Sequence, residues 1–286
     1  MALHLLPSHR DRRSVSRATL RTAVTGIDEA SRTSFDRSAE LYDAARPSYP
    51  EALVDEVVAR SGIPMGGRIL EIGAGTGKAT LPFARRGYAI VALEPGGNMA
   101  AVLRRKVAAF PEVAVEETTF EAWSGADRSF DLVVSAQAFH WVPPAARYVK
   151  AAAALRPGGA LALIRNETSG LDPALRAELE AAYARWFPAV TWTPSRDSIE
   201  SKRGELTGEI GRSGLFGPVQ AASFPWTAAY TTRQYLDLLE THSDHALLAP
   251  GLRTPLYGAV ANAIERRGGR IEVPYVAVLL LTVRND

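Results

Sequence analysis

The sequence predicts a doubly wound α/β fold, in which a mostly parallel sheet carries helices on both faces. Between residues 51 and 164, segments with helical spacing alternate with short apolar segments, an order typical of βαβ units. The apolar segment 129–136 has a centre without polar–apolar alternation, as expected for a strand buried on both faces. A glycine-rich turn, E-I-G-A-G-T-G, leads from the first apolar segment toward a helix-like segment.

The first half of the chain supplies most of the predicted elements. Pro47 and Pro50 end the first predicted helix, and Gly62 ends the second. In order, we expect helices within 35–47 and at 51–60, a strand at 69–72, a helix at 79–86, a strand at 89–93, a helix at 98–109, strands starting at 113 and spanning 129–136, a helix at 148–155 and a strand at 160–164.

The second half has a different character, with longer helical segments and fewer apolar strands. We expect an amphipathic helix at 173–187, no assignable element in the polar stretch 188–217, a strand at 219–226, helices at 232–239 and 256–267, and a closing strand at 273–283. These assignments predict one domain over residues 35–286, with a helical cap or insertion at about 171–217 and the last strands of the same sheet after it.

The N-terminal residues 1–34 are set apart by their charge. Residues 1–25 contain five arginines and one aspartate, while the whole chain has a formal net charge of +2, so the remainder is slightly acidic. The segment lacks the apolar core of a secretory signal but is Arg- and Ser-rich, as organellar transit peptides are. It is interpreted as a basic, disordered extension, as the product of a start codon assigned too early, or as a targeting or binding arm.

The overall composition is that of a soluble globular protein. Hydrophobic residues make up 47% and charged residues 22% of the chain. The sequence has no apolar run of the roughly 18 residues that span a bilayer, and it has no cysteine. We therefore expect a cytoplasmic protein that is not inserted in a membrane. A nucleic-acid partner is disfavoured by the slightly acidic body, and monomer and homodimer both stay open.

The glycine loop and an acid on the next strand point to a nucleoside-containing ligand. A dinucleotide-binding G-x-G-x-x-G pattern would need glycine at position 78, which is Lys78. Glu94 follows the strand at 89–93, seventeen residues beyond Gly77, and a carboxylate there can accept two hydrogen bonds from a ribose diol. Taken singly, the glycines also fit an ordinary tight turn and Glu94 an ordinary surface acid.

With these motifs, the chain resembles the class I S-adenosylmethionine (SAM)-dependent methyltransferases. It is most similar to small-molecule enzymes related to the trans-aconitate and ubiquinone/menaquinone-biosynthesis methyltransferases. The resemblance covers residues 35–170, and extends to 219–283 through the segments Y-T-T-R-Q-Y-L and T-H-S-D-H. It implies a Rossmann-like, seven-stranded sheet, SAM as cofactor with S-adenosylhomocysteine as product, and a small-molecule acceptor methylated on O, N or C.

The resemblance also implies which residues form the site. Tyr42 and Arg46 match a lid over the methionine end of SAM; the alternative is a helix end packed on the sheet with Arg46 solvated. The alternative for Phe120 is core packing. Matches to the methionine-binding loop are Glu71, Gly73, Gly75 and Gly77; the match to the ribose acid is Glu94; matches near the adenine are Asn98, Met99, Phe120 and Glu121.

Residues 135–141, S-A-Q-A-F-H-W, match the motif that lines the methyl-transfer site. Gln137 is expected to contact the cofactor, and His140 is the candidate catalytic residue, with a structural role as the alternative. A hydroxyl acceptor would let His140 take its proton, whereas a carboxylate or tertiary amine needs no base. Asn166 and Glu167 follow the fifth strand and are expected at the same rim. No metal is expected, since His242 and His245 have no evident carboxylate cluster beside them.

Other functions stay open at this point. An RNA methyltransferase would use the Arg-rich arm to hold phosphates, and deletion of residues 1–25 would then abolish RNA binding. A SAM-binding protein without transferase activity has the same motifs. A nicotinamide oxidoreductase is a more remote alternative, and a serine hydrolase is disfavoured because the G-x-S-x-G motif is missing. The acceptor itself cannot be identified from these residues.

Overall fold

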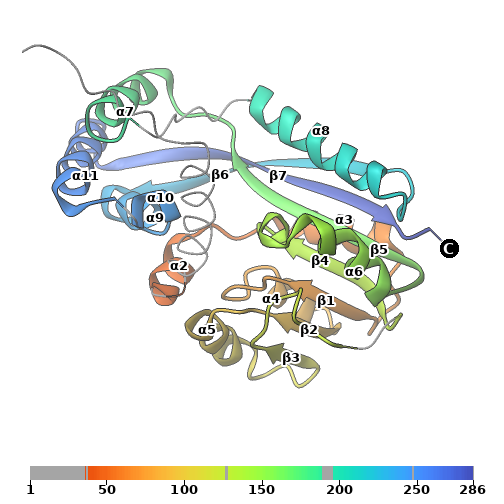
Figure 1. Ribbon diagram of the computed structural model, residues 1–286. Coiled ribbons are helices and arrows are strands. Elements are labelled where there is room, and N and C mark those ends of the chain that lie inside the picture. Colours follow the sequence, from red (N-terminus) through yellow and green to blue (C-terminus); the bar gives the residue numbers. More distant parts are fainter. Residues whose placement is uncertain (1–35, 37, 126–127, 189–195, 247, 286) are drawn as a thin grey trace, which may run out of the picture.

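A computed structural model of the protein describes residues 36, 38–125, 128–188, 196–246 and 248–285 (Figure 1). The predicted extension 1–34 lies outside the described residues. Within the described residues, a seven-stranded sheet has the order β3-β2-β1-β4-β5-β7-β6. The strands are β1 (Arg68–Ile72), β2 (Ala89–Leu93), β3 (Val113–Glu116), β4 (Phe130–Ala136), β5 (Leu155–Thr168), β6 (Gln220–Thr231) and β7 (Arg270–Val283).

The sheet is mostly parallel, as predicted. Strands β3, β2, β1, β4 and β5 pair in parallel. Strand β7 lies antiparallel between β5 and β6. The last strands of the chain thus join the same sheet as the first strands, and both halves of the chain contribute to one sheet.

Helices cover both faces of the sheet, which confirms the doubly wound architecture. Helices α3 (Glu51–Ser61), α4 (Thr80–Ala84) and α5 (Gly97–Val107) bury apolar residues against one face. Helices α6 (Pro144–Ala154) and α8 (Arg196–Ser213) bury theirs against the other. The apolar strand centres therefore have packed neighbours on both sides, which is why they show no alternation.

Four more helices form a cap at one end of the long strands β6 and β7, on the left in Figure 1. They are α7 (Pro173–Trp186), α9 (Thr232–Glu240), α10 (Ser243–Ala246) and α11 (Pro250–Glu265). The cap has an apolar core of its own, in which Leu179, Leu239 and Leu256 pack with Tyr275 of β7. The predicted insertion 171–217 thus has two parts, since α7 belongs to the cap and α8 packs on the sheet.

The cap rests on strands that extend beyond the parallel half of the sheet. Strand β4 pairs with β5 only as far as Ile164, whereas β5 pairs with β7 through residue Thr168. Strand β6 continues to Thr231 opposite Arg270. The overhang places the last residues of β5 and the first half of β7 beside the carboxyl ends of the parallel strands.

Several elements have other bounds in the structure than the sequence predicted; strand β6, predicted to end at 226, continues to Thr231. Helix α8 fills part of the stretch left unassigned. It was missed because its only apolar residues are Ile199, Leu206 and Ile210 and the rest are polar or glycine. Helix α11 begins before Pro255 instead of after it, and this proline is accommodated inside the helix. Strand β5 begins at Leu155 instead of at residue 160, and its partner β4 has a register irregularity between Phe130 and Leu132.

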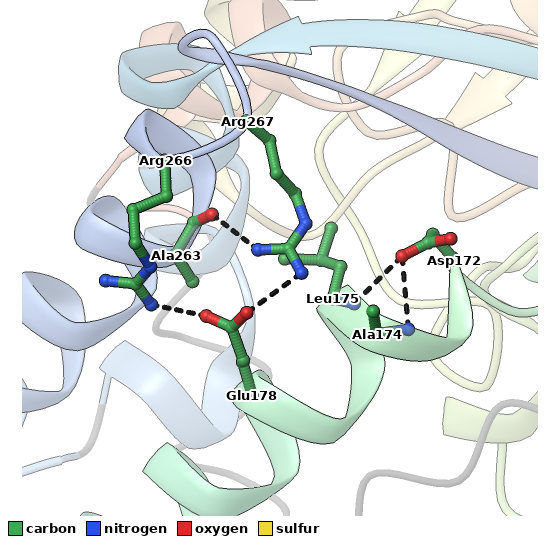
Figure 2. Close-up of polar contacts among 7 residues, drawn as sticks. All are labelled: Asp172, Ala174, Leu175, Glu178, Ala263, Arg266 and Arg267. Carbon is green, nitrogen blue, oxygen red and sulfur yellow. Dashed lines mark hydrogen bonds and ion pairs between the residues drawn. The ribbon is translucent and has the colours of Figure 1, made fainter.

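Polar contacts fix α7 at its start and along its length (Figure 2). The Asp172 side chain accepts hydrogen bonds from the backbone N–H groups of Ala174 (3.1 Å) and Leu175 (3.0 Å), so it caps the helix. Glu178 accepts a hydrogen bond from Arg267 Nη2 at 2.9 Å and also pairs with Arg266. Both arginines follow α11, so Glu178 joins two cap helices. In the described part of the chain, none of the helices has the length and apolar character needed to cross a membrane.

Replacing Asp172 tests whether its side chain caps the N-terminus of α7. We expect Asp172→Ala to lower the free energy of unfolding by about 1 kcal/mol, because two N–H groups lose their partner. Asp172→Asn keeps a capping oxygen and should stay within a few tenths of a kcal/mol of the wild type. Urea unfolding of the three proteins measures both values, and equal losses for Ala and Asn would contradict the capping role.

Candidate functional site

A cavity of about 1560 Å³ lies where the carboxyl ends of β1, β2, β4 and β5 face helix α2 (Ala39–Ala45) and the cap. Open α/β sheets bind ligands at this edge. One side of the cavity is lined by the β1 and β2 loops. We call the opposite side the cap wall; its residues are Tyr235, Leu238, Leu239, His242, Ser243, Asp244, His245, Val273 and Tyr275.

The glycine loop packs tightly at two of its three glycines. A Cβ atom on Gly73 would lie 2.3 Å from Cβ of Ala138, and one on Gly77 would lie 2.4 Å from Cδ1 of Leu103. Any larger side chain would therefore push the loop off its neighbours. A Cβ on Gly75 would meet no protein atom within 4 Å, and Gly75 lines the cavity. The loop is thus held in place by Gly73 and Gly77 and is open to a ligand at Gly75.

Glu94 connects this loop to the end of β2. Its Oε2 accepts a hydrogen bond from the backbone N–H of Gly75, and its Oε1 accepts one from Gly96, both at 2.8 Å. The side chain is largely buried, at 9% exposure, and lines the cavity. Because a carboxylate oxygen can accept more than one hydrogen bond, this fixed carboxylate can also receive ligand hydroxyls.

Glu71, near the end of β1, is a buried carboxyl group on the cavity wall, only 2% exposed. Burial raises the pKa of Glu71 to about 8. The nearby charge of Glu94 adds to this upward shift, and the Thr80 hydroxyl opposes it. The Oε2 atom has no hydrogen-bond partner among the described residues. At neutral pH Glu71 is therefore mostly protonated, and a cationic ligand group beside it would favour the ionised form.

Helix α2 and the residue after it bridge the two sides of the cavity. On the side of the β1 and β2 loops, Asp43 pairs with Lys106 of α5 at 2.6 Å. On the cap side, Arg46 donates from Nε to Oγ1 of Thr241 at 2.8 Å and from Nη2 to its carbonyl oxygen at 2.9 Å. The Arg46 guanidinium also lies 5.3 Å from the ring centre of Tyr42. Two of the donor nitrogens of Arg46 are thus used to hold the cap.

The segment beside α5 has an additional acid that the sequence analysis missed. Asp36 accepts hydrogen bonds from the backbone N–H groups of Asn98 (2.7 Å) and Met99 (3.0 Å), at the start of α5. Met99, Phe120 and Asp36 line the cavity, whereas Asn98 does not. Phe120 is 3% exposed, so it contributes to the core as well as to the wall.

Gln137 lies at the end of β4 in a left-handed backbone conformation, with φ of 61°. Its Nε2 donates to the carbonyl oxygen of Asn166 at 2.7 Å. The Asn166 side chain in turn accepts from Trp226 Nε1 at 3.1 Å and donates to the carbonyl oxygen of Ser48 at 3.3 Å. This network joins β4, β5, β6 and the segment after α2, and it fixes a strained residue at the cavity.

His140 lies in a short 3-10 turn, Phe139–Trp141, with its ring 4.7 Å from that of Trp141. It lines the cavity and stays more than one-third exposed. Partial burial, together with the nearby charges of Arg165 and Arg147, lowers the pKa of His140 below its usual value. At neutral pH the ring is uncharged and can act as a hydrogen-bond acceptor.

The charged rim beside His140 is formed at the overhanging end of β5. Arg165 pairs with Glu167 at 2.7 Å, and Glu167 also pairs with Lys202 of α8 at 2.9 Å. These contacts hold the pKa of Glu167 below its usual value, against the opposing effect of burial. The expectation that Asn166 and Glu167 lie at the rim is confirmed, since both line the cavity.

Most of the predicted site residues meet in this cavity. Those that line it are Tyr42, Arg46, Glu71, Gly73, Gly75, Glu94, Met99, Phe120, Glu121, Gln137 and His140. Gly77 and Asn98 are not part of its lining. Asp36 and Thr241 were missed because their partners lie 62 and 195 residues away in sequence. In the ranges that the structure describes, no group of three or more histidines and acids is arranged to hold a metal ion.

Comparison with known proteins agrees with this geometry. A family model described as a methyltransferase domain matches residues 69–159. An uncharacterized methyltransferase of Mycobacterium tuberculosis is 40% identical over 253 residues, covering 86% of this chain and 93% of the relative. A trans-aconitate 2-methyltransferase of Variovorax paradoxus is 29% identical over 109 residues, 38% of this chain and 42% of that enzyme.

Among solved structures, a candidate type II methyltransferase from Anaeromyxobacter dehalogenans has the same fold, with a TM-score of 0.59 and 23% identity over 82% of this chain and 97% of that one. The chain therefore belongs to the methyltransferase family and is a class I, SAM-dependent methyltransferase by fold and relatives. The predicted resemblance is confirmed.

The buried Glu71 gives the protein a pH-dependent stability that can be measured. Between about pH 5 and 8 the folded protein holds a proton on Glu71 that the unfolded chain has lost. Stability then falls as pH rises through this window. We expect Glu71→Gln, which cannot ionise, to lack this fall, so that its advantage over the wild type grows by on the order of 2–4 kcal/mol from pH 5 to pH 8.

Urea unfolding of both proteins at several pH values, without ligand, checks this expectation. Parallel curves for the wild type and Glu71→Gln would show that Glu71 is ionised in the folded protein. Thr80→Val removes the neighbouring hydroxyl and serves as the matched control, since it leaves the carboxyl group in place.

Proposed function

We propose that this protein transfers a methyl group from SAM to an O, N or C atom of a small-molecule acceptor bound in the described cavity. The observation that carries the proposal is the Glu94 carboxylate, held by the N–H groups of Gly75 and Gly96 at the tip of β2. A fixed acid beside a glycine loop is suited to a ribose diol. We further propose that residues 35–286 form the methyltransferase domain and that residues 1–34 lie outside it.

In this proposal SAM lies along the carboxyl edge of the sheet. The adenine lies between Met99 and the segment with Phe120 and Glu121, and the ribose lies at Glu94. The methionine end lies over Gly73 and Gly75, toward Glu71, Tyr42 and Arg46. Gly77 contributes by packing on Leu103, and Asn98 contributes through its contact with Asp36.

The charges of the cavity fit both ends of the methionine group. SAM has an ammonium and a sulfonium cation, and Glu71 supplies a buried carboxyl that can ionise beside them. Nη1 of Arg46 has no hydrogen-bond partner among the described residues. This nitrogen can bind the methionine carboxylate while Nε and Nη2 hold Thr241. Gln137 also lines the cavity, and we assign it to the contact with the cofactor.

Methyl transfer itself is an in-line displacement at an activated methyl group. The protein needs to align the acceptor atom with the S–CH₃ bond and to exclude water. The cap wall and the charged rim beside His140 (Arg165 and Glu167) border the space next to the proposed methionine end. We therefore place the acceptor there, and its apolar wall (Leu238, Leu239 and Val273) is suited to an organic molecule.

Calorimetric titration of the purified full chain with SAM, S-adenosylhomocysteine and NADH tests the cofactor assignment. We expect micromolar binding of SAM and S-adenosylhomocysteine and no binding of NADH. Binding of NADH alone, or of none of the three, would reject the assignment. Release of S-adenosylhomocysteine in the presence of an acceptor then separates a methyltransferase from a protein that only binds SAM.

Substitution of Glu94 tests the ribose site. We expect Glu94→Ala to weaken SAM binding by about 1–3 kcal/mol, or about 5- to 150-fold in Kd, because the ribose and two backbone N–H groups lose their partner. Glu94→Gln retains one acceptor oxygen, so its loss of SAM affinity should be smaller than that of Glu94→Ala. Calorimetry on both variants measures this, and an unchanged Kd for Glu94→Ala would show that the ribose binds elsewhere.

Substitution of His140 tests the methyl-transfer side. We expect His140→Ala to bind SAM like the wild type, since the proposed cofactor contacts lie elsewhere, and to show a lower kcat/KM for the acceptor by about tenfold or more. Asn166→Asp is a useful comparison, because it alters the network behind Gln137 without touching the His140 ring. Turnover of His140→Ala at the wild-type rate would make this residue structural.

A further inference from the structure

The cap wall contains a second histidine that faces the cavity, His242. Its side chain is only partly buried, and its ring makes no hydrogen bond or ion pair with any described residue. The nearest aromatic neighbour on its own segment is His245, with ring centres 6.2 Å apart. The imidazole nitrogens are therefore available to a ligand in the cavity.

The backbone on both sides of His242 is held firmly. Arg46 clamps the preceding residue, Thr241, through its hydroxyl and its carbonyl oxygen, and the Thr241 hydroxyl donates to the carbonyl oxygen of Leu238 at 2.6 Å. Three residues further on, His245 shares a hydrogen bond of 3.0 Å with the Tyr183 hydroxyl of α7. A side chain without a partner on so well-anchored a segment is pre-positioned for a ligand.

The surroundings of His242 keep its ring uncharged. Burial, the Arg46 guanidinium and His245 all lower the pKa of His242 well below its usual value. The neutral ring offers one nitrogen as donor and one as acceptor. Two other histidines line the cavity. His245 is hydrogen-bonded to Tyr183, and His140 is more exposed and lies beside the charged pair Arg165–Glu167. His242 is the less exposed of His140 and His242, and so it is the better placed for a proton transfer that must exclude water.

We propose that His242 accepts the proton of a hydroxyl group on the acceptor, so that the protein is an O-methyltransferase of alcohols or phenols. This inference rests on the proposed function. In the reaction the hydroxyl oxygen forms a bond to the methyl carbon as the S–CH₃ bond breaks, and the electron pair of that bond stays on sulfur. The O–H proton passes to the free nitrogen of His242, which later releases it to solvent.

The lowered basicity of His242 is compatible with this role. An oxygen that is gaining a methyl group becomes strongly acidic, so a weakly basic imidazole can still take its proton. Arg46 next to His242 disfavours a cationic amine at this place, since like charges repel. A carboxylate acceptor would have no proton to give and would leave the unpartnered nitrogen without a function. A hydroxyl group is uncharged beside Arg46 and has a proton to give to His242.

The test uses the purified full chain and a panel of phenols and aliphatic alcohols, each matched by the corresponding carboxylic acid and primary amine. Release of S-adenosylhomocysteine measures turnover, and calorimetry measures SAM affinity. We expect turnover with hydroxyl probes. We expect His242→Ala to lower kcat by about 10²- to 10⁴-fold with little change in the Kd of SAM, and His242→Gln, which fills the site but takes no proton, to be similarly slow.

His140→Ala serves as the matched comparison, because its loss should appear at least partly in KM for the probe. Normal SAM binding by the His242 variants shows that they are folded. Turnover of acids or amines in place of hydroxyl probes, wild-type kcat in His242→Ala, or a protein that binds SAM and methylates none of the hydroxyl probes would each overturn the inference. Failure of the wild type to bind SAM would overturn the proposed function as well, which separates the two cases.

Discussion

The antiparallel pairing of β7 with β5 and β6 is the constraint on which the rest of the molecule depends. A parallel sheet that ended at Ile164 would have an open carboxyl edge and no cap. Strand β5 instead continues to Thr168 opposite Tyr275, and β6 continues to Thr231. The overhang carries the cap helices and contributes Arg165, Thr168 and Tyr275 to the cavity. The site is therefore the space between the edge of the parallel half and a cap built on its longest strands.

Polar contacts, more than apolar burial, close this space. Helix α2 buries only Ala39 among its seven residues, yet it is tied to the cofactor side through Asp43 and to the cap through the residue after it, Arg46. Elements with few buried apolar contacts are the ones that open at low free-energy cost. Helix α2 is such an element, since it buries few apolar residues and is held at the cavity by polar contacts.

The fold and the loop side of the cavity, to which we assign the cofactor, could be predicted from sequence, because they depend on local signals. Three glycines after an apolar strand, and Glu94 after the next, are read directly, and the structure places Gly75 and Glu94 in contact. The acceptor half depends on contacts between distant segments. The bond from Arg46 to Thr241 spans 195 residues, and helix α8 has too few apolar residues to show its buried face. His242 was noticed only as a possible metal ligand, since nothing local tells that its ring is left without a partner.

Burial moves the titratable groups of the cavity toward their neutral forms, and this has a consequence for how a cation is held. The pKa of Glu71 is raised, while the pKa values of His140 and His242 are lowered. A permanently ionised acid in the place of Glu71 would cost desolvation energy in the empty protein. A carboxyl that ionises only beside a cation avoids that cost, and Glu94, fixed by two N–H groups, supplies the standing negative charge. The neutral histidines on the other side do not oppose a cationic sulfonium, and so binding of the proposed cofactor and proton transfer from the acceptor can take place in one enclosed space.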